Sequence, residues 1–239
     1  MRFMIMHKMT EEMERGLPPD PAMMEAIGGL IRDGMKDNVF VSGEGLRPTS
    51  ERVHIAYRNG KRTITQGPFN DAQELVAGFG LMRVSSQEEA ITWCDKFAAV
   101  LGDVELFLGA VVEPWDLGMM PKPANARLRF LSMHRLDERS PQRAPDAQQI
   151  AAMGALIEEM TSAGVLQATG ALAGTRQGAR VRFQGGKHTV LDGPFAESKE
   201  LVAGYAILDL PSKAEAIAWA IRFGEIVQVN EVEIRELSE

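Results

Sequence analysis

The feature that most constrains this chain is a loop motif that occurs twice. Gly67-Pro68-Phe69 is followed by the run ELVAG at 74–78, and both recur as Gly193-Pro194-Phe195 and the run at 200–204. The offset is 126 positions (193 − 67 = 126). A Gly-Pro-Phe loop, a fixed spacer and a Glu that enters an apolar run do not recur in register by chance. The chain is therefore predicted to contain two copies of one unit.

The repeat also predicts the domain boundaries. We expect a first repeat at residues 1–113 and a second at 127–239. The segment 114–126 between them holds three prolines, so we expect an extended and fairly stiff linker.

Composition and charge exclude several classes of function. An apolar content of 45% and a charged content of 25% are typical of a globular protein with an ordinary core. The net charge of −7 argues against nucleic acid as a partner, because phosphate binding needs clustered Lys and Arg. The single Cys94 excludes an internal disulfide and fits a reducing compartment. The apolar runs are too short for a membrane span or a secretory signal, so we expect a cytoplasmic protein with no membrane partner.

Each repeat follows the same pattern of elements. An apolar strand at 2–7 is followed by a helix that starts at Asp20-Pro21, where an N-cap acceptor precedes a proline at the first helical position. A second strand, a hairpin with Asn59-Gly60 at its turn, a further strand after the Gly-Pro-Phe loop, a second helix and a last strand complete the unit. The second copy repeats this order from Arg129 onward.

This order, β-α-β, hairpin, β-α-β, predicts an α+β fold with two ferredoxin-like repeats, each an antiparallel sheet with both helices on one face. The other sheet face still carries apolar residues. Two such repeats can pack these faces against each other, which gives a pseudo-dimer within one chain. Two independently folded domains in a row are the alternative.

A family resemblance supports this fold. The run Asp192–Glu200 (DGPFAESKE), together with Gly43–Leu46 and Gly204-Tyr205, resembles the signature of the DGPF branch of the YCII-related proteins, and the resemblance covers both copies. It implies a dimeric α+β barrel built from ferredoxin-like units, a bacterial origin and an association with extracytoplasmic-function sigma factors. Founding members of the family were proposed to be enzymes that use a His–Asp pair, whose His lies early in the first helix. This chain has Met23-Met24 and Gln148-Gln149 there, so the pair is not carried over.

The candidate catalytic residues come from comparing the two copies. His7 and His134 form the one histidine pair that matches between them. Each ends an apolar strand and can act as a proton-transfer group or, equally simply, can anchor a loop by hydrogen bonding. Asp192 is the third candidate, but its counterpart in the first copy is Gln66, so any chemistry there belongs to the second copy alone. A turn-capping role for Asp192 is the alternative.

Five further residues are candidate ligand contacts: Glu44, Lys61, Glu74, Lys187 and Glu200. Glu74 and Glu200 match between the copies, as do the two lysines, so each Glu can pair with the Lys of its own copy. An exposed pair of this kind contributes only about 0–1 kcal/mol, so stability is a weak reason to keep it. The four His and one Cys show no metal-ligand spacing, so we expect neither a metal nor a cofactor.

Three functions remain open. The first is a small-molecule-binding, accessory or regulatory protein with a ligand near the sheets and the Gly-Pro-Phe loops. The second is a cofactor-free enzyme in which His7 or His134 works with Glu44 or Asp192. The third is a protein-interaction module, and a further homodimer is compatible with all three. An enzyme requires a His within hydrogen-bond reach of a carboxylate, and a binding protein does not.

Overall fold

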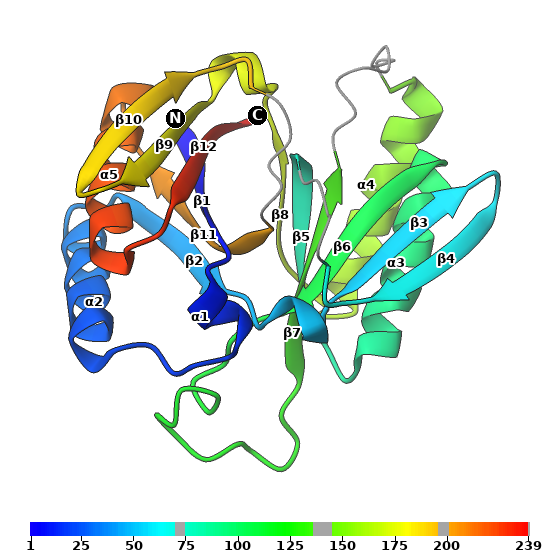
Figure 1. Ribbon diagram of the computed structural model, residues 1–239. Helices are drawn as coiled ribbons and strands as arrows, with labels where there is room; N and C mark the ends of the chain where they lie inside the picture. Colours follow the sequence, from blue (N-terminus) through cyan, green and yellow to red (C-terminus); the bar gives the residue numbers. More distant parts are fainter. Residues whose placement is uncertain (70–74, 136–144, 196–200, 239) are drawn as a thin grey trace. The chain divides into compact units, whose positions relative to one another are not determined.

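The computed structural model describes residues 1–69, 75–135, 145–195 and 201–238. The described chain forms two compact units. Unit 1 comprises residues 1–48 and 171–238, and unit 2 comprises residues 49–69 and 75–170. Each unit therefore combines segments of both sequence repeats, and the compact units do not coincide with the repeats (Figure 1).

Unit 1 is a largely antiparallel sheet with the order β2-β11-β1-β12-β9-β10. Its helices α2 and α5 pack on one face, around a core that includes Phe3, Ile5 and Val181. Its elements are β1 (Arg2–Lys8), α1 (Glu11–Glu14), α2 (Pro21–Lys36), β2 (Phe40–Gly45), the 3-10 turn η2 (Thr175–Gln177), β9 (Ala179–Gln184), β10 (Lys187–Asp192), β11 (Val202–Asp209), α5 (Lys213–Val227) and β12 (Glu231–Ser238).

Unit 2 has the equivalent strand order, β8-β5-β7-β6-β3-β4. Helices α3 and α4 cover one face, around a core that includes Ile55, Met82 and Leu108. Its elements are the 3-10 turn η1 (Thr49–Glu51), β3 (Val53–Arg58), β4 (Lys61–Gln66), β5 (Val76–Val84), α3 (Gln87–Leu101), β6 (Val104–Ala110), β7 (Leu128–Arg135), α4 (Ala147–Ser162) and β8 (Leu166–Leu172), whose last two residues belong to unit 1.

The strand pairing differs from the expectation that each sheet is built from one contiguous repeat. Strand β1 of the first repeat pairs with β11 and β12 of the second, and β7 of the second repeat pairs with β5 and β6 of the first. Because the repeats carry equivalent strands, each can complete the other's sheet with the same contacts, as in a domain swap. The predicted order of elements within each repeat and the antiparallel sheets are confirmed.

The ends of the helices follow the predicted local chemistry. The side chains of Asp20 and Asp146 accept hydrogen bonds from the first backbone N–H groups of α2 and α4. Asn38 and Gly164, after the ends of these helices, have φ angles of 57° and 64°. Both residues tolerate this left-handed conformation, so the two copies end the helix in equivalent ways.

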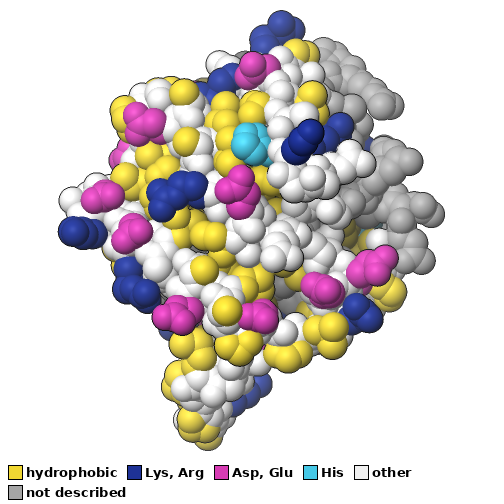
Figure 2. All heavy atoms as spheres, turned by 60° about the vertical axis from the view of Figure 1, so that its left-hand side comes forward, with side chains coloured by type: hydrophobic (Ala, Val, Ile, Leu, Met, Phe, Trp, Pro, Cys, Tyr) yellow, Lys and Arg dark blue, Asp and Glu magenta, His cyan; other side chains and the backbone are white. Residues whose placement is uncertain are grey.

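The helix-covered side of unit 1 has a mixed surface. Figure 2 turns the α2 and α5 side forward and shows acidic and basic side chains interspersed with apolar ones. Among the described residues, no helix combines the length and the apolar character that a membrane crossing requires.

Candidate functional site

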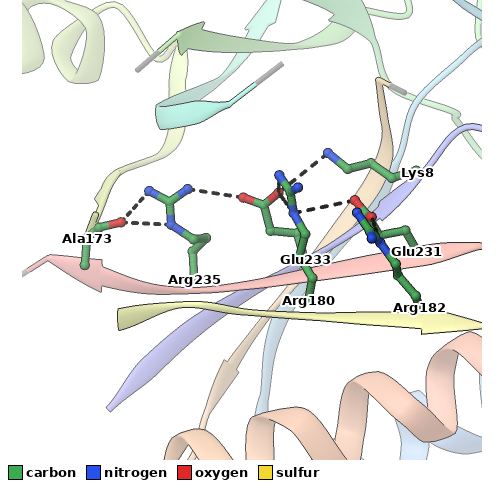
Figure 3. A network of polar contacts seen from close by, with 7 residues as sticks. All are labelled: Lys8, Ala173, Arg180, Arg182, Glu231, Glu233 and Arg235. Carbon is green, nitrogen blue, oxygen red and sulfur yellow. Dashed lines mark hydrogen bonds and ion pairs between the residues drawn. The ribbon is translucent and has the colours of Figure 1, made fainter. Parts of the chain in front are cut away.

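The helix-free face of the sheet in unit 1 carries a buried ionic network (Figure 3). Alternation along β12 places Val232 and Ile234 in the core under the helices, so Glu233 and Arg235 lie on the opposite face. The Arg180 guanidinium contacts the Glu233 carboxylate at 2.9 Å, Arg235 contacts it at 3.1 Å and Lys8 at 3.8 Å. These four residues are only 0–3% exposed. Three cations therefore surround one carboxylate in the interior.

This arrangement fixes the charge of Glu233. Burial opposes ionisation of the carboxyl, but the charges of Lys8, Arg180 and Arg235 outweigh it and hold the pKa of Glu233 below its usual range. Arg235 also donates from Nε to the Ala173 carbonyl oxygen at 2.8 Å. The network thus ties β1, β9 and β12 to the chain that follows β8.

A second carboxylate lies at the edge of this network, which we call its rim. Glu231 lies opposite Arg182 in the β12–β9 register and accepts from its Nε at 2.9 Å. Arg180 Nε lies 3.5 Å from the same carboxylate. Arg182 extends to the surface, with its side chain 55% exposed. The network is therefore closed at Glu233 and reaches solvent at Arg182.

The second Gly-Pro-Phe loop packs on this network. The Gly193 N–H donates to the Gly178 carbonyl at 3.2 Å, and a Cβ at Gly193 would overlap the Thr175 carbonyl oxygen. Phe195 lies under the Arg180 guanidinium, whose Cζ is 4.1 Å from the ring centroid. The loop therefore stacks an aromatic ring on a buried cation, a favourable arrangement because the ring face is negative.

The first Gly-Pro-Phe loop has the same frame in unit 2. The Gly67 N–H donates to the Arg52 carbonyl at 3.0 Å, and Gln66 Nε2 donates to the carbonyls of Ser50 and Arg52. Phe69 packs edge-on against Phe107, with the ring centroids 5.5 Å apart. Both Gly-Pro peptide bonds are cis. Here the loop aromatic meets another aromatic ring instead of a guanidinium.

A different polar cluster occupies the helix-free face of unit 2. His54 alternates with the core residues of β3, and its Nε2 lies 3.5 Å from the Glu105 carboxylate. The guanidinium of Arg135 contacts the same carboxylate at 3.3 Å, and Arg58 also pairs with it. The His54 ring packs on Phe107 at 4.8 Å. The side chains of His54, Glu105 and Arg135 are 20–30% exposed, so solvent reaches this cluster.

The charges of this cluster also control Glu105. Partial burial acts against ionisation, but the hydrogen bond from Arg135 and the charges of Arg58 and His54 hold the pKa of Glu105 below its usual range. At neutral pH the cluster therefore combines an ionised carboxylate, two guanidinium groups and an imidazole on a part-exposed surface.

Comparison with known proteins places this chain in a family. The model of the YCII-related domain matches residues 1–105 and again residues 129–238. The chain belongs to the YCII-related family. The two matches agree with the tandem duplication predicted from the repeated motif.

The further comparisons add little about activity. An uncharacterised protein of Rhizobium meliloti (strain 1021) is 35% identical over 68 residues, which cover 28% of this chain and 55% of that protein. The match thus spans about half of that relative's length. No solved structure matches this YCII-related chain. Neither comparison names a ligand or a reaction.

In this YCII-related chain the predicted histidines lie on the helix-covered faces. His7 packs on Phe223 of α5 at 5.3 Å, and His134 packs on Phe97 of α3 at 5.4 Å. His7 Nε2 would lie 2.6 Å from a Cβ at Gly204, and His134 hydrogen-bonds the backbone of Gly78. Both glycines adjoin a register shift in the sheet. This geometry supports the anchoring role for the histidines.

His7 is not placed to work with Glu44. His7 of β1 pairs with Gly204 of β11, and Gly204 pairs in turn with Gly45 of β2. Glu44 is the neighbour of Gly45 in β2 and pairs with Tyr205. Neighbouring strand residues point to opposite faces, so Glu44 points away from His7. For His134, burial lowers the pKa to about 4, although its hydrogen bond with Gly78 acts in the other direction. Its imidazole is therefore neutral at pH 7.

The other predicted site residues are dispersed. Asp192 is 73% exposed at its side chain and accepts from Lys213 Nζ at 2.8 Å. Lys61 and Lys187 begin β4 and β10, at the ends remote from the Gly-Pro-Phe loops. Glu74 and Glu200 lie outside the described residues, so their proposed pairing with these lysines stays a prediction.

Metal and thiol chemistry find no support among the described residues. No group of three or more His, Cys, Asp or Glu there is arranged to hold a metal ion. Cys94 is buried in α3, and burial raises the pKa of its thiol to about 12. This buried thiol is therefore a packing group.

Sequence reasoning missed both ionic clusters. Matching residue types between the copies excludes His54, because its counterpart is Arg180, yet the two residues hold equivalent places in the two clusters. A usable signal was present in β12, where Glu231, Glu233 and Arg235 alternate with Val and Ile. Alternation of charged and β-branched residues within one strand indicates a polar face opposite a core face.

Proposed function

We propose that this YCII-related chain is a small-molecule-binding protein whose ligand contacts the helix-free face of unit 2 beside the first Gly-Pro-Phe loop. The observation that supports this most is the part-exposed cluster of His54, Glu105 and Arg135 next to the rings of Phe107 and Phe69. Ligand sites combine an apolar, often aromatic surface with a few convergent polar groups. The corresponding cluster of unit 1 is centred on Glu233, which is buried and pairs with Lys8, Arg180 and Arg235.

The family resemblance adds two points to this proposal, an accessory or regulatory role and a link to sigma-factor regulation. The dimeric α+β barrel implied by the resemblance is likewise a proposal about the arrangement of the two units. The sequence repeats at 1–113 and 127–239 are the proposed units of duplication, and a cytoplasmic location is part of the same proposal.

A fragment screen tests the binding function. We expect members of a mixed library of charged and neutral fragments to raise the melting temperature of the wild type and to show saturation-transfer signals. These signals should disappear in His54→Gln and Arg135→Gln. The matched control is Arg182→Gln, which removes an arginine paired with Glu231, the unit 1 counterpart of Glu105. A library without binders, or binding that survives both unit 2 variants, would overturn the proposal.

A second candidate is acid–base catalysis by His54, because its Nε2 lies 3.5 Å from the Glu105 carboxylate. This pair replaces the combinations of His7 or His134 with Glu44 or Asp192. An NMR time course of each bound fragment distinguishes the candidates. Chemical conversion in the wild type and none in His54→Gln supports an enzyme, whereas unchanged fragments support a binding protein.

A further inference from the structure

The sheet of unit 1 ends in a strand that is exposed along its whole length. Strand β10 follows the two-residue turn at Gly185-Gly186, and among the described strands it pairs with β9 alone (Figure 1). All six of its residues are exposed, including the apolar Val190 at 42% and Leu191 at 39%. A strand edge is a template for pairing with another strand, and many proteins protect it with charges. The residues of β10 therefore decide whether its edge repels or accepts a second chain.

The backbone of β10 directs alternate residues to its outer edge. The Gly193 N–H, one residue beyond the strand, donates to the carbonyl of Gly178, which adjoins β9, at 3.2 Å. In an antiparallel ladder every second residue bonds to the neighbouring strand, so the odd-numbered residues of β10 also bond to β9. The even-numbered residues direct their N–H and C=O groups outward, and these are His188, Val190 and Asp192. A second strand can hydrogen-bond to these three residues.

The three outward-bonding residues form a self-complementary pattern. Their side chains share one face of the strand, with His188 at one end, Val190 in the middle and Asp192 at the other end. When two copies of β10 run antiparallel with Val190 opposite Val190, each His188 lies opposite the Asp192 of the other copy. A shift of two residues in either direction removes this charge pairing. The complementarity therefore favours a second copy of the same strand in one register.

The equivalent strand of unit 2 does not have this pattern. Strand β4 is also exposed along its length, and its residues at the same three places are Arg62, Ile64 and Gln66. Two copies of β4 in the same register would place Arg62 opposite Gln66, which carries no charge. Arg62 instead pairs with Asp95 of its own unit. The change from Gln66 to Asp192 between the repeats thus turns an edge with a basic end into a self-complementary one.

Both end groups of this pattern have a partner within unit 1 and remain accessible. Asp192 accepts through Oδ1 from Lys213 Nζ at 2.8 Å, and its side chain is 73% exposed. His188 Nδ1 lies 3.7 Å from the Glu225 carboxylate, and its side chain is 40% exposed. Exposed ion pairs of this kind are weak, so they do not prevent His188 and Asp192 from contacting a second copy.

We propose that β10 pairs edge to edge with β10 of a second copy of this chain, antiparallel and centred on Val190, so that the two unit 1 sheets become one continuous sheet. A His188–Asp192 pair closes each end, and Thr189 lies opposite Leu191 on the other face. Two strands of this length bury less than the roughly 1,200–2,000 Å² of a stable interface, so the dimer is weak and forms at high concentration. This surface belongs to unit 1 and does not depend on the ligand site proposed for unit 2.

Two measurements on the wild-type chain test the pairing and its register. Sedimentation velocity between about 10 μM and about 1 mM should show a concentration-dependent monomer–dimer equilibrium. Over the same range, the amides of His188, Val190 and Asp192 should gain protection from hydrogen exchange. Those of Thr189 and Leu191 already bond to β9 and should change little. A monomer at every concentration, or equal gains in the two sets of amides, would overturn the proposal.

Two charge variants test the contact residues. His188→Glu places acidic groups opposite each other at both ends of the dimer, and Asp192→Lys places basic groups there. Each variant alone should weaken self-association by about tenfold or more, because each change acts twice. An equal mixture of the two variants should recover the dimer, since the introduced Glu then faces the introduced Lys and the native His188 faces the native Asp192. A mixture that associates no better than either variant alone would overturn the proposed register.

Arg62→Glu in β4 is the matched control, because Arg62 holds the place of His188. It should leave the dissociation constant of the dimer within about twofold of the wild type. A loss as large as that of His188→Glu would show that β4 takes part in the contact and would overturn the pairing of β10 with itself. Melting temperatures identify any variant that fails to fold, and in that case the exchange of the wild-type amides still decides the question.

Discussion

The two ionic clusters occupy equivalent positions on equivalent sheets, yet one is sealed and the other is open to solvent. In unit 1, the carboxylate of Glu233 is fully buried among Lys8, Arg180 and Arg235. In unit 2, Glu105 pairs with Arg135, Arg58 and His54 at the surface. Burial decides what a charge can do, because a desolvated charge must be paired within the protein, whereas a part-exposed charge can exchange water for a ligand.

The comparison also shows how duplicated copies diverge. The Gly-Pro-Phe loops keep the same backbone frame in both units, and each stacks its Phe beside the cluster. The polar groups around this frame differ in residue type and in the strand that supplies them. In the first copy, Arg52 before β3 packs on Gly109 of β6. In the second copy, Arg235 of β12 packs on Gly178 before β9. The charged groups around Glu233 are buried in unit 1, whereas those around Glu105 in unit 2 are part-exposed.

The largest contrast is expected from removing the two acidic residues. Glu233→Gln removes the carboxylate that the buried Lys8, Arg180 and Arg235 share, and this should lower the free energy of unfolding by about 3–5 kcal/mol. Glu105→Gln, the matched change in unit 2, should cost about 1 kcal/mol or less because its partners are part-exposed. Urea denaturation measures both effects. Hydrogen exchange of the β12 and β6 amides shows in which unit the loss arises.

Equal losses in the two variants would remove the distinction between a sealed and an open cluster. A small loss in Glu233→Gln alone would indicate that solvent reaches the unit 1 network when the carboxylate is neutralised.

Substitution of the loop glycine, in contrast, should lower the free energy of unfolding by a similar amount in both units. A Cβ at Gly67 would overlap the Thr49 carbonyl oxygen, and a Cβ at Gly193 would overlap that of Thr175. Gly67→Ala and Gly193→Ala must therefore shift backbone, and each should cost about 1–3 kcal/mol or more. Gly154→Ala is the control, since a Cβ there meets nothing within 4 Å in helix α4, and it should stabilise by about 0.5–1 kcal/mol. A clear difference between the two loop variants would show that the frames are not equivalent.

Much of the fold could be predicted because its signals are local. The N-cap at Asp20 and the hairpin turn at Asn59-Gly60 form where the sequence indicated, and Asp146 and Gly185-Gly186 hold the equivalent places in the second copy. Each depends on the chemistry of a few neighbouring residues. The exchange of strands between repeats could not be predicted, because β1 and β7 present the same pattern to either set of partners.

The candidate site was harder to predict than the fold. Matching residues by identity selected His7 and His134, which the structure places under the helices. In the two clusters, by contrast, different residues occupy equivalent positions in the sheets, as with His54 and Arg180, or Phe107 and Glu233. Only the strand register brings these residues together, and the register depends on contacts between distant parts of the chain.

The last predicted effect concerns His134 in unit 2 and appears only in acid, so it is absent at neutral pH. Its pKa is lowered to about 4 in the folded state, compared with 6.5 for an ordinary histidine. Between these two values the unfolded chain binds a proton that the folded chain does not, so the free energy of unfolding falls as the pH drops. The difference between these two pKa values corresponds to at most about 3 kcal/mol of lost stability at pH 4, and the loss becomes negligible as the pH rises above 6.5.

His134→Gln should remove this acid-dependent loss, whereas His188→Gln, which changes an exposed side chain of β10, should leave the pH profile unchanged. Denaturation curves recorded at intervals between pH 7 and 4 measure the profile. His7→Gln extends the comparison to unit 1, where the histidine holds the equivalent place against Phe223. A profile that stays steep in His134→Gln would assign the acid sensitivity to the carboxylates of the ionic clusters, and Glu233, held ionised by buried cations, would then be the first residue to test.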